Sequence, residues 1–299
     1  MKIRLFKYGL LFVTIIVTGK MICAQDHKSN LDSIAIHYWD YIDFSDTSLY
    51  VKPLAAGSFY GNTFSAMEEM SGEFFSLLLN TSEPVLKSSV KRLLDKACSY
   101  KDSRTDPFGF FMAVAEKYFY DIHSPYYNEN SFLAFLDYKT GREDIAEIEK
   151  SREKYLSALI RKNMVGTMAE NLALKGGGKP SLYDVLGSLT ERQSLMLVFF
   201  SAECGTCIDG ITRLKYSPVL KKQIQEGEMA VLAVCVEGKL SHVKSVLPGD
   251  WMVASDGGAV YQDQTYSIRN TPSVYVLERS GIVLLKDADV SSAIDILLE

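Results

Sequence analysis

Cys204 and Cys207, two cysteines separated by Gly205 and Thr206, are the residues of this sequence best suited to chemistry. Within a helix this spacing is about one turn, which is close enough for the two sulfurs to form a disulfide. If a helix starts at Cys204, its thiolate receives backbone N–H groups and the positive end of the helix dipole, which lower its pKa from about 8.5. The sequence then predicts that Cys204 is the attacking sulfur and Cys207 the more buried, resolving one.

The residues that flank the pair predict a strand, a short loop and then that helix. Leu195–Phe200 is a run of apolar residues, typical of a central strand buried on both faces. The rest of this half continues to alternate strands and helices. We expect a second buried strand, an antiparallel hairpin and a final helix, at Met229–Val236, at Ser273–Leu277 with Ile282–Leu285, and at Val290–Leu298. Residues 166–299 are therefore predicted to form a mixed α/β sheet with flanking helices.

Residues 26–165 follow a different pattern. Apolar side chains recur at spacings of three and four, as on one face of a helix, and prolines fall between these blocks. The blocks are Phe64–Leu78, Leu86–Ala97, Phe110–Tyr120 and Ile145–Ile160, and the breaks are Pro84, Asp106-Pro107 and Ser124-Pro125. We expect an all-helical domain of about four to six helices. The polar and aromatic stretch His123–Glu129 is either a docking patch or, as we favour, a turn with an Asn or Ser helix cap.

Two segments of the C-terminal half resemble the thioredoxin family. Phe199–Cys207 is similar to the active-site segment of that family, and Asn270–Leu277, followed by Ser280-Gly281, is similar to its cis-proline loop and the hairpin after it. The long insert between the two segments is similar to that of exported TlpA-like members. The resemblance implies a thioredoxin-like fold for residues 166–299. It also implies that Pro272 is cis and faces the cysteines, and that the Thr271 backbone pairs with a substrate chain.

The activity that this resemblance implies is thiol–disulfide exchange with exported protein substrates. Cys204 would attack, Cys207 would resolve, and Thr271 with Pro272 would orient the target. No diffusible cofactor is needed, because the electrons come from the dithiol of a redox partner protein. The residues leave the direction of electron flow open, and the TlpA-like resemblance favours a reductase.

Two positions depart from the family pattern, and both concern proton transfer. Many thioredoxins hold a buried aspartate six residues before the first cysteine, where this sequence has Val198. Several TlpA-like reductants carry a glutamate three residues after the second cysteine, where this sequence has Gly210. Either acid would assist proton transfer from the buried thiol. Their absence argues against a highly active enzyme.

The helical half resembles a domain of unknown function that precedes such modules in exported proteins of anaerobic Gram-negative bacteria. The resemblance rests on Ala115–Asp121, Ser124-Pro125 and Asn128-Glu129. It places this half in a known context and implies no activity for it.

Residues 1–25 predict a cleavable secretory signal peptide. Basic residues precede an apolar run that ends in small residues: Lys2, Arg4 and Lys7, then Tyr8–Val17, then Cys23-Ala24. The apolar run is shorter than the about 20 residues that span a bilayer. Cleavage after Ala24 fits best, and a lipid anchor at Cys23 is disfavoured because Ile22 before it is not small. We expect a periplasmic or otherwise exported protein with no membrane span in the mature chain.

The cysteine pair has two alternative uses. A structural zinc site needs about four ligands, and the sequence has no second CxxC and only four scattered histidines. A static disulfide would leave a non-catalytic envelope binding module on a thioredoxin-like scaffold. Cys98 and Cys235 lie in apolar segments and are interpreted as core residues. The net charge of −5, with no basic patch, argues against nucleic acid as a partner.

Overall fold

The computed structural model describes residues 30–51, 64–100, 105–242 and 245–297. The predicted signal peptide and its cleavage site lie outside these residues. The chain divides into two compact units, residues 1–154 and 155–299, and the division falls inside helix α6 (Ser151–Arg161). The expected domain boundary between residues 165 and 166 stays a prediction.

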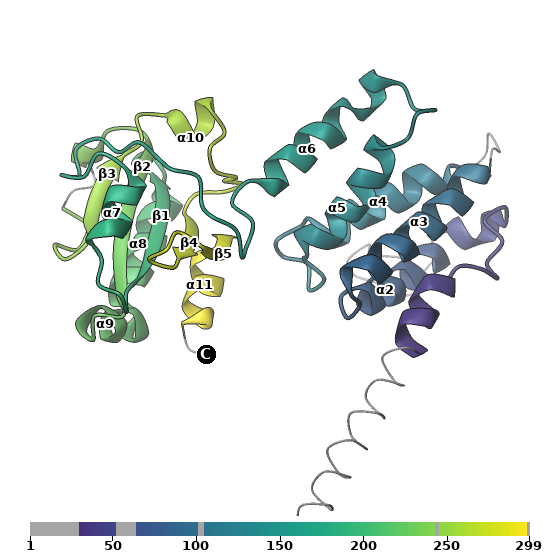
Figure 1. Ribbon diagram of the computed structural model, residues 1–299, viewed down its shortest axis with the longest axis horizontal. Coiled ribbons are helices and arrows are strands. Elements are labelled where there is room, and N and C mark those ends of the chain that lie inside the picture. The colour runs from purple at the N-terminus through teal and green to yellow at the C-terminus, as the bar shows by residue number, and fades with distance from the viewer. Residues whose placement is uncertain (1–29, 52–63, 101–104, 243–244, 298–299) are drawn as a thin grey trace, which may run out of the picture. The chain divides into compact units, whose positions relative to one another are not determined.

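The described part of the N-terminal unit is helical, which confirms the fold class expected for this half (Figure 1). A first helix covers residues 30–37. The elements that follow are η1 (Thr47–Tyr50), α2 (Ala66–Leu78), α3 (Glu83–Ser99), α4 (Pro107–Phe119), α5 (Glu129–Thr140), η2 (Glu147–Lys150) and the start of α6. Phenylalanines from several of these helices, among them Phe75, Phe119 and Phe135, are fully buried and contact one another edge-on or tilted.

Polar residues ahead of these helices satisfy the N–H groups of their first turns. The Asn128 side chain accepts a hydrogen bond from Ser131 N at 2.9 Å, so the predicted helix cap in the 123–129 stretch is confirmed. Asp106 accepts one from Gly109 N at 2.9 Å, with Pro107 as the first residue of α4. Proline suits this position because its missing N–H would have no partner there.

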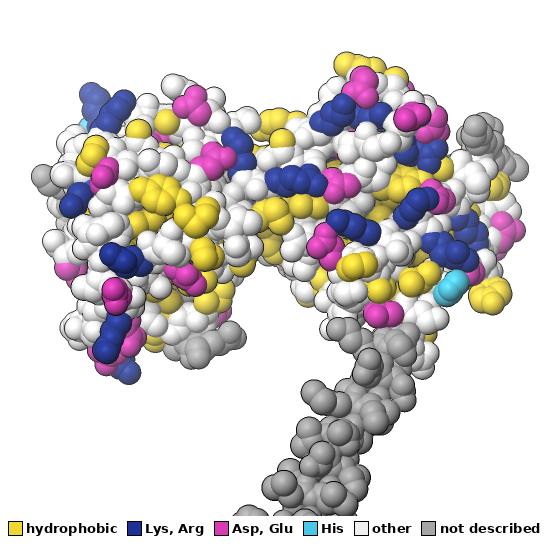
Figure 2. Space-filling model, in the orientation of Figure 1, with side chains coloured by type: hydrophobic (Ala, Val, Ile, Leu, Met, Phe, Trp, Pro, Cys, Tyr) yellow, Lys and Arg dark blue, Asp and Glu magenta, His cyan; other side chains and the backbone are white. Residues whose placement is uncertain are grey.

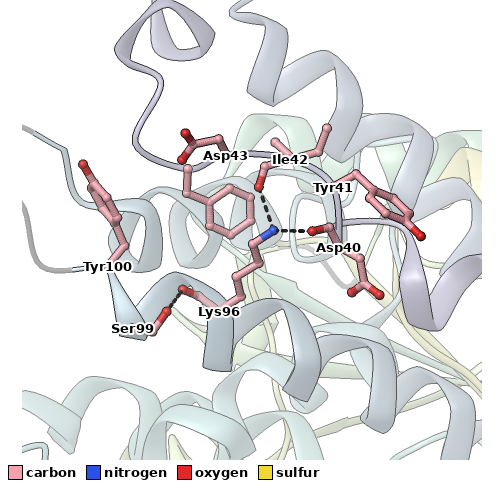
Figure 3. A pocket seen from close by; sticks show the side chains of 8 residues that line it. Asp40, Tyr41, Ile42, Asp43, Lys96, Ser99 and Tyr100 are labelled. Atoms are coloured by element: carbon pink, nitrogen blue, oxygen red, sulfur yellow. Dashed lines mark hydrogen bonds between the residues drawn. The ribbon is translucent and has the colours of Figure 1, made fainter.

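Lys96 fixes the turn that follows the first helix. Its Nζ donates to the carbonyl oxygens of Trp39, Asp40 and Ile42 at 2.7, 2.9 and 2.7 Å, and lies 5.0 Å from the centre of the Phe44 ring. The ammonium lies among the residues that line a pocket of about 320 Å³. Figure 3 shows it directed at the backbone carbonyl oxygens of the turn. The arrangement therefore stabilises the turn.

The C-terminal unit contains one five-stranded sheet in the order β3-β2-β1-β4-β5. The strands are β1 (Ser194–Ser201), β2 (Met229–Glu237), β3 (Met252–Ser255), β4 (Ser273–Leu277) and β5 (Val283–Ala288). The first three are parallel, and β4 and β5 run antiparallel to their neighbours. This is the mixed sheet that the sequence predicts.

Helices cover both faces of the sheet (Figure 1). α7 (Leu182–Ser188) and α10 (Ala259–Gln262) pack on one face, and α8 (Gly205–Tyr216), α9 (Pro218–Gln225) and α11 (Val290–Ile296) on the other. The side chains of β1 alternate between these two cores, with Leu197 and Phe199 in the first and Val198 and Phe200 in the second. The apolar run is thus explained by burial on both faces.

Segments of irregular chain pair with both outer strands. Residues 166–169 run beside β5, with Gly166 N donating to Val283 O at 2.8 Å and Val283 N to Thr167 O at 2.9 Å. At the other edge, Lys175 and Ser255 of β3 exchange two backbone hydrogen bonds of 2.7 and 2.9 Å. The sheet edge is therefore covered at these positions.

The surface carries both signs of charge, and on the face shown in Figure 2 the basic and acidic side chains are interspersed. Among the described residues, none of the helices combines the length and the apolar character needed to cross a membrane.

The end of α6 and the residues after it are fastened to the C-terminal unit. The buried Lys286 ammonium donates to Ile160 O at 2.6 Å. Lys162 Nζ donates to Gln264 O at 2.5 Å, and Asn163 Nδ2 donates to Thr265 O at 2.9 Å. These bonds hold the segment that leads toward Thr271, so residues 155–163 contribute to the stability of this unit.

A fragment of residues 155–299 is therefore expected to be more stable than one of residues 166–299. The shorter fragment loses the three hydrogen bonds just described, each worth about 1 kcal/mol, so its free energy of unfolding should be lower by about 3 kcal/mol. Urea unfolding followed by circular dichroism measures the difference. Equal stability would mean that residues 155–165 are dispensable for this unit.

Candidate functional site

The register of the sheet brings the predicted site residues to one place. Ser273 of β4 pairs with Phe199 of β1 in an antiparallel ladder. Because the strands run in opposite directions, Pro272 and Thr271 lie level with the last residues of β1, next to the start of the loop to Cys204. The peptide bond between Thr271 and Pro272 is cis, as the resemblance implies.

Gly210 shows how closely the proline approaches helix α8. A Cβ atom added at Gly210 would lie 2.6 Å from Pro272 Cγ and 3.2 Å from Val290 Cγ2. Real Cβ atoms do not approach carbon so closely, so a side chain at this position requires the loop to move. Gly210 comes one turn after Cys207 on the same helix, and the proline ring therefore packs beside the cysteine pair.

The Cys204 sulfur caps helix α8. Cys204 is the N-cap residue, with extended backbone angles, and its Sγ accepts a hydrogen bond from Cys207 N at 3.3 Å. Serine and threonine oxygens do the same at other helix starts. A sulfur in this place is stabilised as the thiolate, since it faces the N–H groups of the first turn.

The pKa of Cys204 is held below its ordinary value chiefly by Thr206. The Thr206 hydroxyl lies 2.9 Å from Cys204 Sγ and donates to it when the sulfur is ionised. Hydrogen bonds from the Cys207 side chain and from the backbone N–H groups of Cys207 and Thr206 lower the pKa further. Cys204 is partly exposed, so its thiolate is open to attack on an incoming disulfide.

Cys207 has the opposite environment. Its side chain is fully buried among the apolar residues of α8 and the sheet, and this burial raises its pKa to about 11. A hydrogen bond with the Thr271 side chain lowers that pKa, while the one with Cys204 raises it. Near neutral pH the pair therefore holds a reactive sulfur at the surface and a protonated thiol beneath it.

The four predicted site residues, Cys204, Cys207, Thr271 and Pro272, are thus neighbours. Sequence reasoning missed the part played by two hydroxyls. The Thr206 hydroxyl contacts the first sulfur, and the Thr271 side chain contacts the second, although only the Thr271 backbone was expected to matter. A threonine between the cysteines was a visible signal, but which sulfur its hydroxyl faces depends on the helix geometry.

The remaining cysteines lie elsewhere. Cys235 is buried, as expected, and its thiol donates to Glu237 O at 3.1 Å. Cys98 is only half-buried, beside the Tyr138 hydroxyl at 3.9 Å, so its interpretation as a plain core residue is corrected. All four described cysteines are free thiols. Within the part of the chain that the structure describes, His, Cys, Asp and Glu side chains form no cluster of three or more that would hold a metal ion.

A solved structure resembles most of this chain. The structure of a thioredoxin-like protein from Bacteroides caccae superposes with a TM-score of 0.72 at 24% identity, covering 91% of this chain and 93% of that one. The C-terminal unit has a thioredoxin-like fold. The fold expected from the cysteine and proline motifs is therefore confirmed, and β1, α8 and β4 of the thioredoxin-like unit carry those motifs.

A family match and two further solved structures cover parts of the chain. Residues 21–163 match the family described as a domain of unknown function (DUF5106). Two further solved structures each cover 46% of this chain and 99% of their own. They are the C-terminal domain of an uncharacterized protein from Bacteroides fragilis (26% identity, TM-score 0.41) and the thioredoxin domain of a thiol-disulfide oxidoreductase from Bacteroides vulgatus (14%, 0.35). No curated protein matches the chain.

Replacing Thr206 by valine is expected to raise the pKa of Cys204, because the thiolate loses its main hydrogen-bond donor. Hydrogen bonds to charged groups are strong, so alkylation of Cys204 at pH 7 should slow by roughly threefold to tenfold. The rate of iodoacetamide modification as a function of pH measures this. Thr212→Val is the matched control, since the Thr212 hydroxyl lies further along α8 and donates to Ile208 O. An unchanged profile in Thr206→Val would contradict the assignment.

Replacing Gly210 by alanine is expected to displace the proline loop. The added methyl group overlaps Pro272, and such overpacking costs about 1–3 kcal/mol of stability. Gly187→Ala on α7 is the control, because a Cβ there meets nothing within 4 Å. Thermal unfolding of both variants gives the comparison. Equal melting temperatures would mean that the loop accommodates the methyl group without cost.

Proposed function

We propose that this protein is a thiol–disulfide oxidoreductase that acts on protein substrates through Cys204 and Cys207. The observation that carries the proposal is the contrast between the two thiols. A helix-capping sulfur with a lowered pKa lies at the surface, and three residues later a fully buried thiol has its pKa raised to about 11. Cys207 hydrogen-bonds the Thr271 side chain, and Pro272 packs on the same helix at Gly210.

In the reducing direction the exchange has two steps. The Cys204 thiolate attacks a substrate disulfide, forms a mixed disulfide and releases one substrate sulfur as a thiolate. Cys207 then loses its proton and attacks Cys204 Sγ, which releases the second substrate sulfur and leaves a Cys204–Cys207 disulfide. A partner dithiol reduces this disulfide by the same two steps, so two electrons pass from partner to substrate and no diffusible cofactor is involved.

Two features shape this proposal. Val198 is buried beside α8 and offers no group that accepts the Cys207 proton, and Gly210 leaves no room for an acid next to Pro272. Resolution of the mixed disulfide is therefore proposed as the slow step.

The basic and apolar pattern of residues 1–25 supports a site of action in the periplasm or another exported location, where disulfide substrates occur. There the TlpA-like resemblance favours the reducing direction.

The proposed activity is tested by insulin reduction with dithiothreitol as electron source, using the chain from Gln25 onward. The parent should accelerate insulin precipitation, Cys204→Ser should fall to the uncatalysed rate, and Cys207→Ala should accumulate mixed disulfides that a thiol reagent releases. Cys98→Ser is the matched control and should retain the parent rate, because Cys98 lies in the other unit.

An inactive parent that also traps no partner from cell-envelope extracts as Cys207→Ala would contradict the proposal. That pair of results would favour the alternative, a binding module in which the thioredoxin-like unit is a scaffold with a static disulfide. Equal activity in Cys204→Ser and the parent would likewise exclude Cys204 as the attacking sulfur.

A further inference from the structure

Strand β5 contains a bulge that places one acidic residue beneath the proline loop. Val274 pairs with Ala288 and Val276 with Leu285, so two residues of β5, Lys286 and Asp287, lie opposite Tyr275 alone. Asp287 has a φ of 46°, in the left-handed region that aspartate enters more readily than most residues. Bulges of this kind redirect a side chain. Here the redirected group is a carboxylate.

The Asp287 carboxylate binds both ends of the segment that carries Thr271 and Pro272. One oxygen accepts a hydrogen bond from the Ser273 hydroxyl at 2.8 Å. The other accepts one from Arg269 Nε at 2.6 Å, and Arg269 N lies 3.4 Å from both oxygens. Arg269 precedes Thr271 by two residues, and Ser273 follows Pro272 directly.

These groups are withdrawn from water, so the bonds between them are strong. Asp287 is 5% exposed and Ser273 is 1% exposed, while the Arg269 side chain of the ion pair is 17% exposed. Burial raises the pKa of the Asp287 carboxyl, and the Arg269 guanidinium counteracts that rise. A buried carboxylate that lost its cation would be costly, which ties the position of Arg269 to that of Asp287.

We infer that Asp287, Arg269 and Ser273 are positioning residues that hold the Thr271-Pro272 loop in place for a polypeptide substrate at Cys204. The inference rests on the proposed function in one respect, since it assumes that the loop contacts the substrate. The carboxylate touches no reacting atom. It acts by fixing both ends of a five-residue segment, and so limits the positions that Thr271 takes up relative to the two sulfurs.

The test compares a large and a small disulfide in the full mature chain. Asp287→Asn keeps the shape of the side chain and removes the charge that binds Arg269. Its KM for insulin should rise about tenfold with kcat within about twofold of the parent. Its reaction with the small aryl disulfide DTNB, which needs only the Cys204 thiolate, should stay within about twofold. Ser273→Ala removes one of the bonds, leaves the ion pair intact and should raise KM about threefold.

Hydrogen exchange supplies a readout that is independent of turnover. Peptides that cover residues 269–273 should exchange faster in Asp287→Asn, whereas peptides from β1 should not change. Asp289→Asn is the matched control, because Asp289 lies two residues away and caps α11 through Ser291 N and Ser292 N, a role that asparagine also fills.

The outcomes separate this inference from the proposed function. A folded Asp287→Asn with unchanged KM or unchanged exchange in the loop overturns the inference, and so does an equal loss of insulin and DTNB reactivity. If Asp287→Asn does not fold, Ser273→Ala decides by the same measurements. If the parent reduces no insulin and Cys207→Ala traps no partner, the proposed function fails, and the exchange measurement still decides whether Asp287 holds the loop.

Discussion

The antiparallel pairing of β4 with β1 is the constraint on which the site depends. β1 delivers the cysteine loop at its end, and β4 delivers the Thr271-Pro272 loop at its beginning, so opposite strand directions bring the two loops together. If β4 ran parallel to β1, its first residues, and the proline before them, would lie at the opposite end of the strands, where β1 begins. Helix α8 then closes the arrangement, because Gly210 allows Pro272 to pack directly on it. The register of the sheet and the absence of a side chain at Gly210 therefore set the distance between the cysteines and the loop.

The same helix start gives two identical side chains different chemistry. Cys204 is the cap residue and receives N–H groups and the Thr206 hydroxyl, whereas Cys207 is one turn inside and is surrounded by apolar side chains. No charged residue is needed for this difference. Exposure to donors favours the thiolate and exclusion from water disfavours it. In the proposed exchange reaction, the order of attack follows from the place of each cysteine along the helix.

Much of this arrangement was predictable because it depends on local patterns of residue type along the sequence. The strand before Cys204 is marked by an apolar run. The start of a helix at Pro107 is marked by a residue that has no backbone N–H. The start of helix α5 was predicted from its cap, but its extent was not, because residues 131–136 are all buried and show no single apolar face. The expected helix from Ile145 begins instead as the 3-10 turn at Glu147. The position of Asp287 depends on a bulge, which interrupts the alternation that a strand pattern relies on.

The covered edges of the sheet limit how this unit recognises other chains. Residues 166–169 occupy the hydrogen-bonding groups along the start of β5, and Lys175 occupies those of Ser255 on β3. An extended peptide that sought to add a strand at either place would first have to displace a segment of the protein itself. Recognition by strand addition is thus disfavoured at these positions of the outer strands, and so is self-association through them.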